Sequence, residues 1–136
     1  MRRFALVLLA GLAFGCTASL QDIRQREPIY KGDFPKPYQT TARCIFERLD
    51  AQTGSSSWST FTLTGGLSSF VYRLDDPPDV KRARVDAISV NGPPSAEFEI
   101  TVEPTANGGS HIEYRRRWDG FRSTDWAAWG VATKCG

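Results

Sequence analysis

The sequence predicts an α+β fold, in which an N-terminal helix packs on an antiparallel sheet of about five strands and a short C-terminal helix closes the domain. Two patterns favour this architecture. Apolar residues recur at spacings of three and four after Tyr38, as on one face of a helix, and they alternate with polar residues from Trp58 onward, as in half-buried strands. The sheet is therefore expected to have one apolar face and one charged face.

The first helix is predicted from an apolar stripe that ends at Leu49, and Thr40 or Thr41 is its expected N-cap. Cys44 lies well round the helix from this stripe. A covalent partner for Cys44 would therefore have to come from a segment along the helix flank. The stripe consists of Tyr38, Ala42, Ile45, Phe46 and Leu49.

Two alternating segments, Trp58 to Thr64 and Ser68 to Leu74, are predicted to form a hairpin with Gly65-Gly66 as its two-residue turn. This turn sets Phe61 opposite Phe70. An aromatic cross-strand pair stabilises a sheet, so it supports this register.

A third strand is expected from about Lys81 to Val90. Val85 and Ala87 share one parity, whereas Ile88 and Val90 share the other. The change of parity predicts a β-bulge within this strand.

The last hairpin places acidic residues opposite basic ones. Pairing Val102 with Ile112 keeps apolar residues together and puts Ile100 opposite Tyr114. The charged residues are then expected to form an ion-pair ladder on the solvent face, each pair worth roughly 0.2 to 1 kcal/mol. An anion-binding strip is the alternative. The facing pairs are Glu99 with Arg115, Glu97 with Arg117 and Glu103 with His111.

Arg116 falls on the apolar side of its strand, beside Tyr114 and Trp118. The favoured interpretation is that it stacks on these rings with its guanidinium at the sheet edge, and the alternative is burial against a carboxylate. If Arg116 instead lines a cleft, it becomes the best single candidate for binding an anionic ligand.

The C-terminal segment holds three of the four tryptophans. A short helix is expected to begin near Trp126, capped by Ser123-Thr124-Asp125, although Gly130 weakens it and a final strand is the alternative. The rings either close the core over the sheet or form an exposed platform for sugar rings of peptidoglycan or a protein partner. The candidate ligand or partner surface is Arg116, Trp118, Phe121, Trp126 and Trp129.

The N-terminus has the pattern of an export signal. Arg2 and Arg3 precede an uncharged apolar run from Phe4 to Phe14, which is too short to span about 30 Å of hydrocarbon but fits a signal-peptide core. Leu12-Ala13-Phe14-Gly15-Cys16 resembles the lipobox of bacterial lipoproteins. The resemblance implies removal of a signal peptide, residues 1–15, and attachment of diacylglycerol and fatty acids such as palmitate at Cys16. Ordinary secretory cleavage after Cys16-Thr17-Ala18 is the alternative.

A lipoprotein is held in the cell envelope by its lipid anchor, so the membrane is an expected partner. Thr17 is not the aspartate that retains such lipoproteins in the inner membrane, and the resemblance therefore implies the outer membrane, with the domain facing the periplasm. Residues 16–37 hold three prolines and no sustained apolar period, which predicts a flexible tether. Residues 38–136 are expected to form a single domain.

Assigning Cys16 to lipid leaves Cys44 and Cys135, an even pair in a compartment that permits disulfides. A bridge between them would close almost the whole domain into one loop. A metal site is the alternative, but two isolated thiols and a single histidine do not furnish four ligands. We therefore expect a disulfide, and no metal or other cofactor.

Charge and motifs limit the function. The chain has 17 basic and 15 acidic residues, so loss of Arg2 and Arg3 would leave a formally neutral chain without the basic surplus of nucleic-acid binders. Sequence motifs of catalysis, such as GxSxG and HExxH, are missing. The favoured function is a non-enzymatic envelope protein that binds a protein partner or a cell-wall component. The alternatives are an inhibitor or protective protein against lytic enzymes, and a small hydrolase that uses carboxylates such as Asp119 and Asp125.

Overall fold

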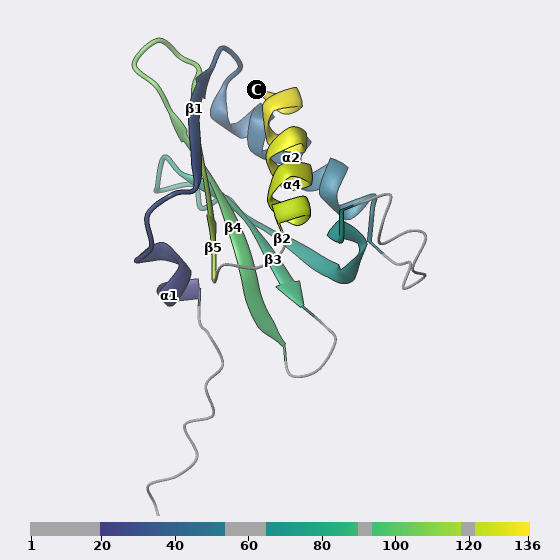
Figure 1. Ribbon diagram of the computed structural model, residues 1–136. Helices are drawn as coiled ribbons and strands as arrows, with labels where there is room; N and C mark the ends of the chain where they lie inside the picture. Colours follow the sequence, from purple (N-terminus) through teal and green to yellow (C-terminus); the bar gives the residue numbers. More distant parts are fainter. Residues whose placement is uncertain (1–19, 54–64, 90–93, 118–121) are drawn as a thin grey trace, which may run out of the picture.

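The computed structural model describes residues 20–53, 65–89, 94–117 and 122–136, and its architecture is α+β (Figure 1). An antiparallel sheet of five strands lies at its centre, in the order β1-β5-β4-β3-β2. The predicted fold class and an antiparallel sheet of about five strands are thus confirmed. The strands are β1 (Tyr30–Phe34), β2 (Phe70–Asp75), β3 (Ala83–Ser89), β4 (Ser95–Pro104) and β5 (Ser110–Arg116).

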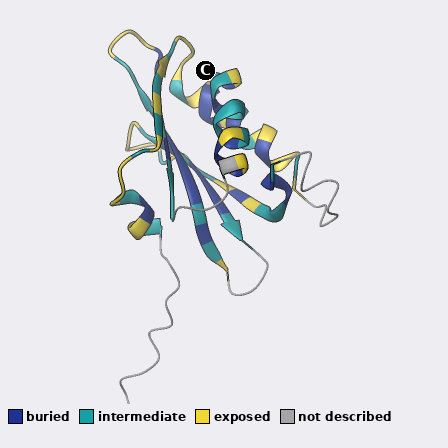
Figure 2. Ribbon diagram, in the orientation of Figure 1, coloured by how far each residue is buried: buried dark blue, intermediate teal, exposed yellow. Residues whose placement is uncertain are grey.

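Helices cover the two faces of the sheet unequally. Helix α2 (Tyr38–Asp50) and helix α4 (Arg122–Cys135) lie side by side on one face, where they close the hydrophobic core. The short helix α1 (Leu20–Arg24) packs on the opposite face, mainly against β4. Figure 2 shows the result as a band of buried residues along the central strands, with exposed residues on α1 and the loops.

The prediction of a flexible tether over residues 16–37 is wrong for residues 20–34. Ile23 of α1 is fully buried, and β1 pairs along its whole length with β5, from Tyr30 opposite Tyr114 to Phe34 opposite Ser110. Both elements have only five residues, too few to show a sustained apolar period, and elements this short depend on tertiary contacts for stability. The domain therefore begins by Leu20, not at Tyr38.

The helix predicted from the stripe at Tyr38 is α2, which buries Ile45 and Leu49 completely. The expected N-cap is wrong. The residue before the helix is Pro37, whose carbonyl already accepts a helical hydrogen bond from the amide of Thr41 at 3.0 Å. Thr40 and Thr41 therefore lie within the first turn of the helix.

The predicted strand Trp58 to Thr64, and with it the pairing of Phe61 with Phe70, lies outside the described residues. Gly65 and Gly66 both have positive φ, as the predicted turn requires. The next residues form a 3-10 helix, η1 (Leu67–Ser69), so β2 begins two residues later than predicted. The buried Tyr72 hydroxyl donates to the carbonyl of Leu67 at 2.6 Å, which holds this turn of helix against the sheet.

The predicted bulge and the predicted last hairpin are confirmed. The register between β3 and β4 shifts between Ala87 and Ile88. Strands β4 and β5 pair in the predicted register, with Ile100 opposite Tyr114 and Glu99 opposite Arg115. Side chains that face one another across these strands therefore follow from the sequence pattern alone.

The C-terminal helix differs from its prediction in start and length. It begins at Arg122, not near Trp126, and continues for 14 residues through Gly130. Ser123-Thr124-Asp125 therefore lie in its first turn and do not cap it. The Thr124 hydroxyl instead donates to the carbonyl of Gly65 at 2.7 Å, which fastens the start of α4 to the turn before η1.

A disulfide joins the two core helices. Cys44 of α2 and Cys135 of α4 are bonded, with Cα atoms 5.7 Å apart and 91 positions apart in the chain. The segment that flanks α2, as the sequence required for Cys44, is α4. Lys36 adds a hydrogen bond from Nζ to the carbonyl of Cys135 at 3.1 Å.

Replacing both Cys44 and Cys135 by alanine should lower the free energy of unfolding by about 4 to 5 kcal/mol, because the bridge restricts the unfolded chain over 91 positions. Equilibrium denaturation in urea measures this loss. The single variant Lys36→Ala is the control for the same end of α4, and we expect it to lose much less. A double cysteine variant as stable as the wild type would contradict this account of the bridge.

Candidate functional site

Four aromatic side chains gather where β1 meets α4, and we call them the aromatic surface: Tyr30, Phe34, Trp126 and Trp129. Tyr30 stacks on Trp129, with ring centroids 5.5 Å apart, and Phe34 meets the same indole edge-on at 6.2 Å. Trp126 lies 6.4 Å from Tyr30 and is 68% exposed, the highest exposure of the large hydrophobic residues that the structure describes. The other three rings are half-buried.

The sequence of β1 explains how two rings reach α4. Tyr30 and Phe34 share one face of the strand because side chains alternate along it, and Gly32 lies between them on that face. A Cβ atom at Gly32 would come within 3.2 Å of the Phe34 ring and 3.8 Å of Trp129. The absence of a side chain at Gly32 therefore provides the space in which the Phe34 and Trp129 rings come into contact.

Two of the predicted site residues, Trp126 and Trp129, lie in the aromatic surface. Trp118 and Phe121 fall outside the described residues. Sequence reasoning missed Tyr30 and Phe34 because it took their segment for a tether. The alternation of aromatic, glycine and aromatic in YKGDF was the available signal for a short strand.

For Arg116, the alternative of burial against a carboxylate is correct, whereas stacking on Trp118 involves a residue outside the described ranges. Its guanidinium forms an ion pair with Asp125 of α4, and both side chains are largely buried, at 14% and 4% exposed. The Tyr114 hydroxyl donates to the other carboxylate oxygen of Asp125 at 2.7 Å. Burial raises the pKa of Tyr114, and the hydrogen bond to Asp125 adds to this.

Asp125, a carboxylate considered for hydrolysis, is therefore held on both oxygens by structural partners. Asp119, the other carboxylate considered for hydrolysis, lies outside the described residues. The contacts of Asp125 tie α4 to β5 from inside the core, a position with little access for substrate.

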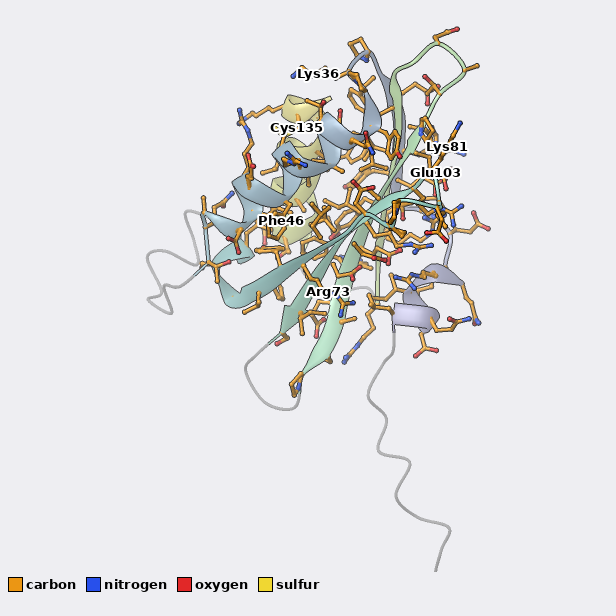
Figure 3. The ribbon with its side chains drawn as sticks, turned by 180° about the vertical axis from the view of Figure 1, so that it is seen from behind. Lys36, Phe46, Arg73, Lys81, Glu103 and Cys135 are labelled. Atoms are coloured by element: carbon orange, nitrogen blue, oxygen red, sulfur yellow. A yellow bond between two sulfur atoms is a disulfide. The ribbon has the colours of Figure 1, made fainter. Side chains whose placement is uncertain are left out.

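The opposite face of the sheet carries charged side chains from all five strands, and we call it the ionic face. Figure 3 labels Arg73 of β2 and Glu103 of β4 there, across the sheet from Phe46 and Cys135. The predicted ladder of solvated pairs is only partly present. Arg117 lies 3.7 Å from Glu97, but Glu99, although opposite Arg115 in register, is 1% exposed and accepts a hydrogen bond from Arg24 Nε at 2.8 Å. Helix α1 covers this part of the face. Its residues were predicted from the sequence to belong to a tether.

Two buried acids face each other beneath α1. Asp86 of β3 and Glu99 of β4 are cross-strand neighbours, and they are 0% and 1% exposed. Arg73 donates to Oδ2 of Asp86 at 2.8 Å, while Oδ1 finds no N–H donor within the described ranges. Burial raises the pKa of Asp86 to about 6, against the effect of Arg73, and the hydrogen bond with Glu99 contributes. A proton on Asp86, which the raised pKa favours, would let this oxygen form a hydrogen bond with Glu99.

An open hollow of about 190 Å³ lies next to these acids. Its wall brings together α1, the segment before β3, and strands β3, β4 and β5. Four arginines, three glutamates and one threonine line it: Arg24, Arg82, Arg84, Glu99, Thr101, Glu103, Glu113 and Arg115. The pocket was not foreseen from sequence, because it needs α1 to fold back on the sheet.

The single histidine belongs to the β1 side of the ionic face. His111 forms a hydrogen bond with Asp33 of β1 and lies 3.4 Å from Glu113. The hydrogen bond with Asp33 raises the pKa of His111, and the charges of Asp33 and Glu113 add to it against partial desolvation. For Glu113, burial favours the neutral form, but Arg115 and His111 together lower its pKa.

Comparisons with known proteins assign no activity to these surfaces, since no protein-family model and no curated protein matches the chain. Within the described residues, no three His, Cys, Asp or Glu side chains come together as a metal site requires. No helix in the part of the chain that the structure describes is long and apolar enough to cross a bilayer.

The buried acid pair should make stability depend on pH. The folded-state pKa of Asp86 lies near 6, above its ordinary value of 3.8, so the folded protein binds this proton more tightly than the unfolded chain. Its contribution is therefore full below about pH 4 and is lost as the pH rises through 6. In Asp86→Asn the amide can donate to Glu99 and accept from Arg73, and urea denaturation between pH 4 and 7.5 should show a weaker decline of stability with pH.

Asp75→Asn is the matched control, because Asp75 lies on the same face and is 47% exposed. We expect this variant to keep the wild-type slope. If Asp86→Asn retained the full slope as well, the proton would not reside on the buried pair.

Proposed function

We propose that this chain is a non-enzymatic, lipid-anchored protein of the bacterial envelope that binds a protein partner or a cell-wall component through the aromatic surface. The observation that supports it most is the exposure of Trp126, 68%, beside aromatic neighbours that are half-buried. Exposing a tryptophan to water forgoes the stabilisation of its burial, and tryptophan is enriched at the centres of binding interfaces.

The geometry of the aromatic surface suits recognition without catalysis. Tyr30 and Trp129 are fixed by stacking and by the β1–β5 pairing, so they support Trp126 as part of a preorganised patch. A sugar ring can stack on the exposed indole face, and a protein partner can enclose it. Arg116 pairs with Asp125 of α4, and both side chains are largely buried.

The proposed anchor is Cys16, after removal of residues 1–15. Leu20, the first residue of α1, is four positions after Cys16, so lipid and domain would be no more than about 14 Å apart along the chain. A lipidated protein of this kind would sit close to the headgroups of its membrane, which we propose to be the outer membrane on its periplasmic side.

Mass spectrometry of the protein extracted from bacterial membranes tests the anchor. We expect a chain that begins at Cys16 with added diacylglycerol and acyl mass, and two thiols, from Cys44 and Cys135, that react with iodoacetamide only after reduction. Cys16→Ser should remain unprocessed or leave the membrane fraction. A wild-type chain that begins at Ser19 without lipid would contradict lipidation and indicate a freely diffusing exported protein.

A photo-crosslinking amino acid placed at Trp126 tests the aromatic surface in intact cells. Cross-links to one defined envelope protein, absent with the same probe at Val80, would support a protein partner. Val80 is a suitable control because it is also an exposed apolar residue, at 42%.

The cell-wall alternative uses purified peptidoglycan. Cosedimentation of the wild type that is lost in Trp126→Ser, but kept in Val80→Ser, would assign the surface to glycan. Neither variant should change the thermal unfolding temperature by more than a few degrees, because both side chains belong to the exposed large hydrophobic residues. If the probe at Trp126 forms no specific cross-link and peptidoglycan retains no protein, the proposed function is wrong.

A further inference from the structure

The ionic hollow has the chemistry of an oxyanion site, and we infer that it binds a phosphate group with Arg84 as the principal donor. The hollow lies on the other side of the sheet from the core helices. It does not depend on the aromatic surface or on the function proposed for that surface.

Arg84 is the arginine of the hollow whose hydrogen-bonding capacity is unused. Its side chain is only 20% exposed, yet its ion pairs are long, 3.7 Å to Asp75 and 3.9 Å to Glu99, and within the described residues it makes no hydrogen bond through its side chain. A guanidinium carries five N–H donors. None of the Arg84 nitrogens is among the buried atoms without a partner, so its donors are open to the solvent of the hollow. A ligand that enters the hollow can supply the missing acceptors.

The other three arginines that line the hollow already have close carboxylate partners. Arg24 contacts Glu99 at 2.7 Å, Arg115 contacts Glu113 at 2.5 Å, and Arg82 is hydrogen-bonded to Glu103. The carboxylate of Glu99 is therefore a close partner of Arg24, at 2.7 Å, and only a distant partner of Arg84, at 3.9 Å. Among the lining residues four guanidiniums therefore face three carboxylates, and Arg84 is the one whose nearest carboxylate, the half-exposed Asp75 at 3.7 Å, lies outside the lining.

The size and shape of the site favour an oxyanion over a single-atom anion. The hollow of about 190 Å³ exceeds several times the roughly 30 Å³ that one water molecule occupies in the liquid, so a phosphate group with part of an attached headgroup fits. The planar fork of an arginine binds two phosphate oxygens at once. The hydroxyl of Thr101, which donates to Glu99 at 3.3 Å, is a second donor in the wall beside Arg84.

The phosphate has two possible sources, the headgroup of a membrane lipid or free phosphate in solution. Arg24 belongs to α1, which follows the proposed lipidation site by a few residues. If Cys16 is lipidated, headgroups are available to the hollow at high local concentration. Free phosphate requires no such proximity, so the two sources can be separated by experiment.

The test observes arginine Nε–H signals by NMR in the full mature protein, held in alkyl-maltoside micelles that contain no phosphate. Sodium phosphate is titrated against sodium chloride at equal ionic strength, and phosphatidylglycerol is added to the micelles in a parallel series. We expect a saturable shift of one arginine signal, missing in Arg84→Gln, and binding weakened at least tenfold in that variant.

Two further variants make the result specific. Arg84→Lys keeps the positive charge but loses the planar fork of the guanidinium, so it should fold and bind phosphate with intermediate affinity. If Arg84→Gln does not fold, the comparison of Arg84→Lys with the wild type replaces it. Arg43→Gln removes an exposed charge from α2 and should bind as the wild type does.

Saturation by phosphate alone would identify free phosphate as the ligand. Saturation at much lower concentrations of phosphatidylglycerol, reversed by added phosphate, would identify the lipid headgroup. The inference is overturned if neither probe causes a saturable shift, if chloride has the same effect, or if Arg84→Gln binds as tightly as Arg43→Gln.

Discussion

The pairing of β4 with β5 is the constraint on which the rest of the structure depends. It sets Ile100 opposite Tyr114 on the core face and Glu99 opposite Arg115 on the other. Because side chains alternate along a strand, a slip of one residue would exchange every one of these positions. Apolar burial on one face therefore fixes the register, and the register in turn decides where each charged residue goes.

Each face uses a buried carboxylate to hold a helix. On the core face, Asp125 of α4 is bound by Tyr114 and Arg116 of β5. On the ionic face, Glu99 of β4 accepts from Arg24 of α1. Removing one member of a buried charged pair leaves the other without compensation, so each contact specifies the position of its helix more strongly than its net stabilisation suggests.

The two proposed binding surfaces differ in their chemistry because they lie on different layers. The aromatic surface forms at the β1 edge, where Tyr30 meets Trp126 and Trp129. The hollow forms where α1 folds onto β4 and brings Arg24 to the wall that contains Arg84. Both surfaces require the segment between Leu20 and Phe34, so a chain that began at Tyr38 would lose two rings of the first, Tyr30 and Phe34, and one wall of the second.

Sequence alone determined the features that depend on local period and on cysteine number. The α+β class, the bulge after Ala87, the β4–β5 register and the Cys44–Cys135 pair follow from alternation, turn glycines and an even pair of thiols. Alternation is a property of neighbouring residues, and the cysteine pair follows from counting thiols, so neither requires knowledge of the rest of the fold.

Only the tertiary structure decided which secondary structure the short segments form and which partners their side chains have. Residues 20–34 offer only the short alternation of YKGDF as a local signal, and α1 and β1 depend on the sheet, which buries Ile23 and pairs with Tyr30. Arg116 was recognised as lying on the apolar side of its strand, but its partner Asp125 comes from a helix whose start was misplaced. The energy of such contacts comes from burial between distant segments, and a one-dimensional pattern does not contain that information.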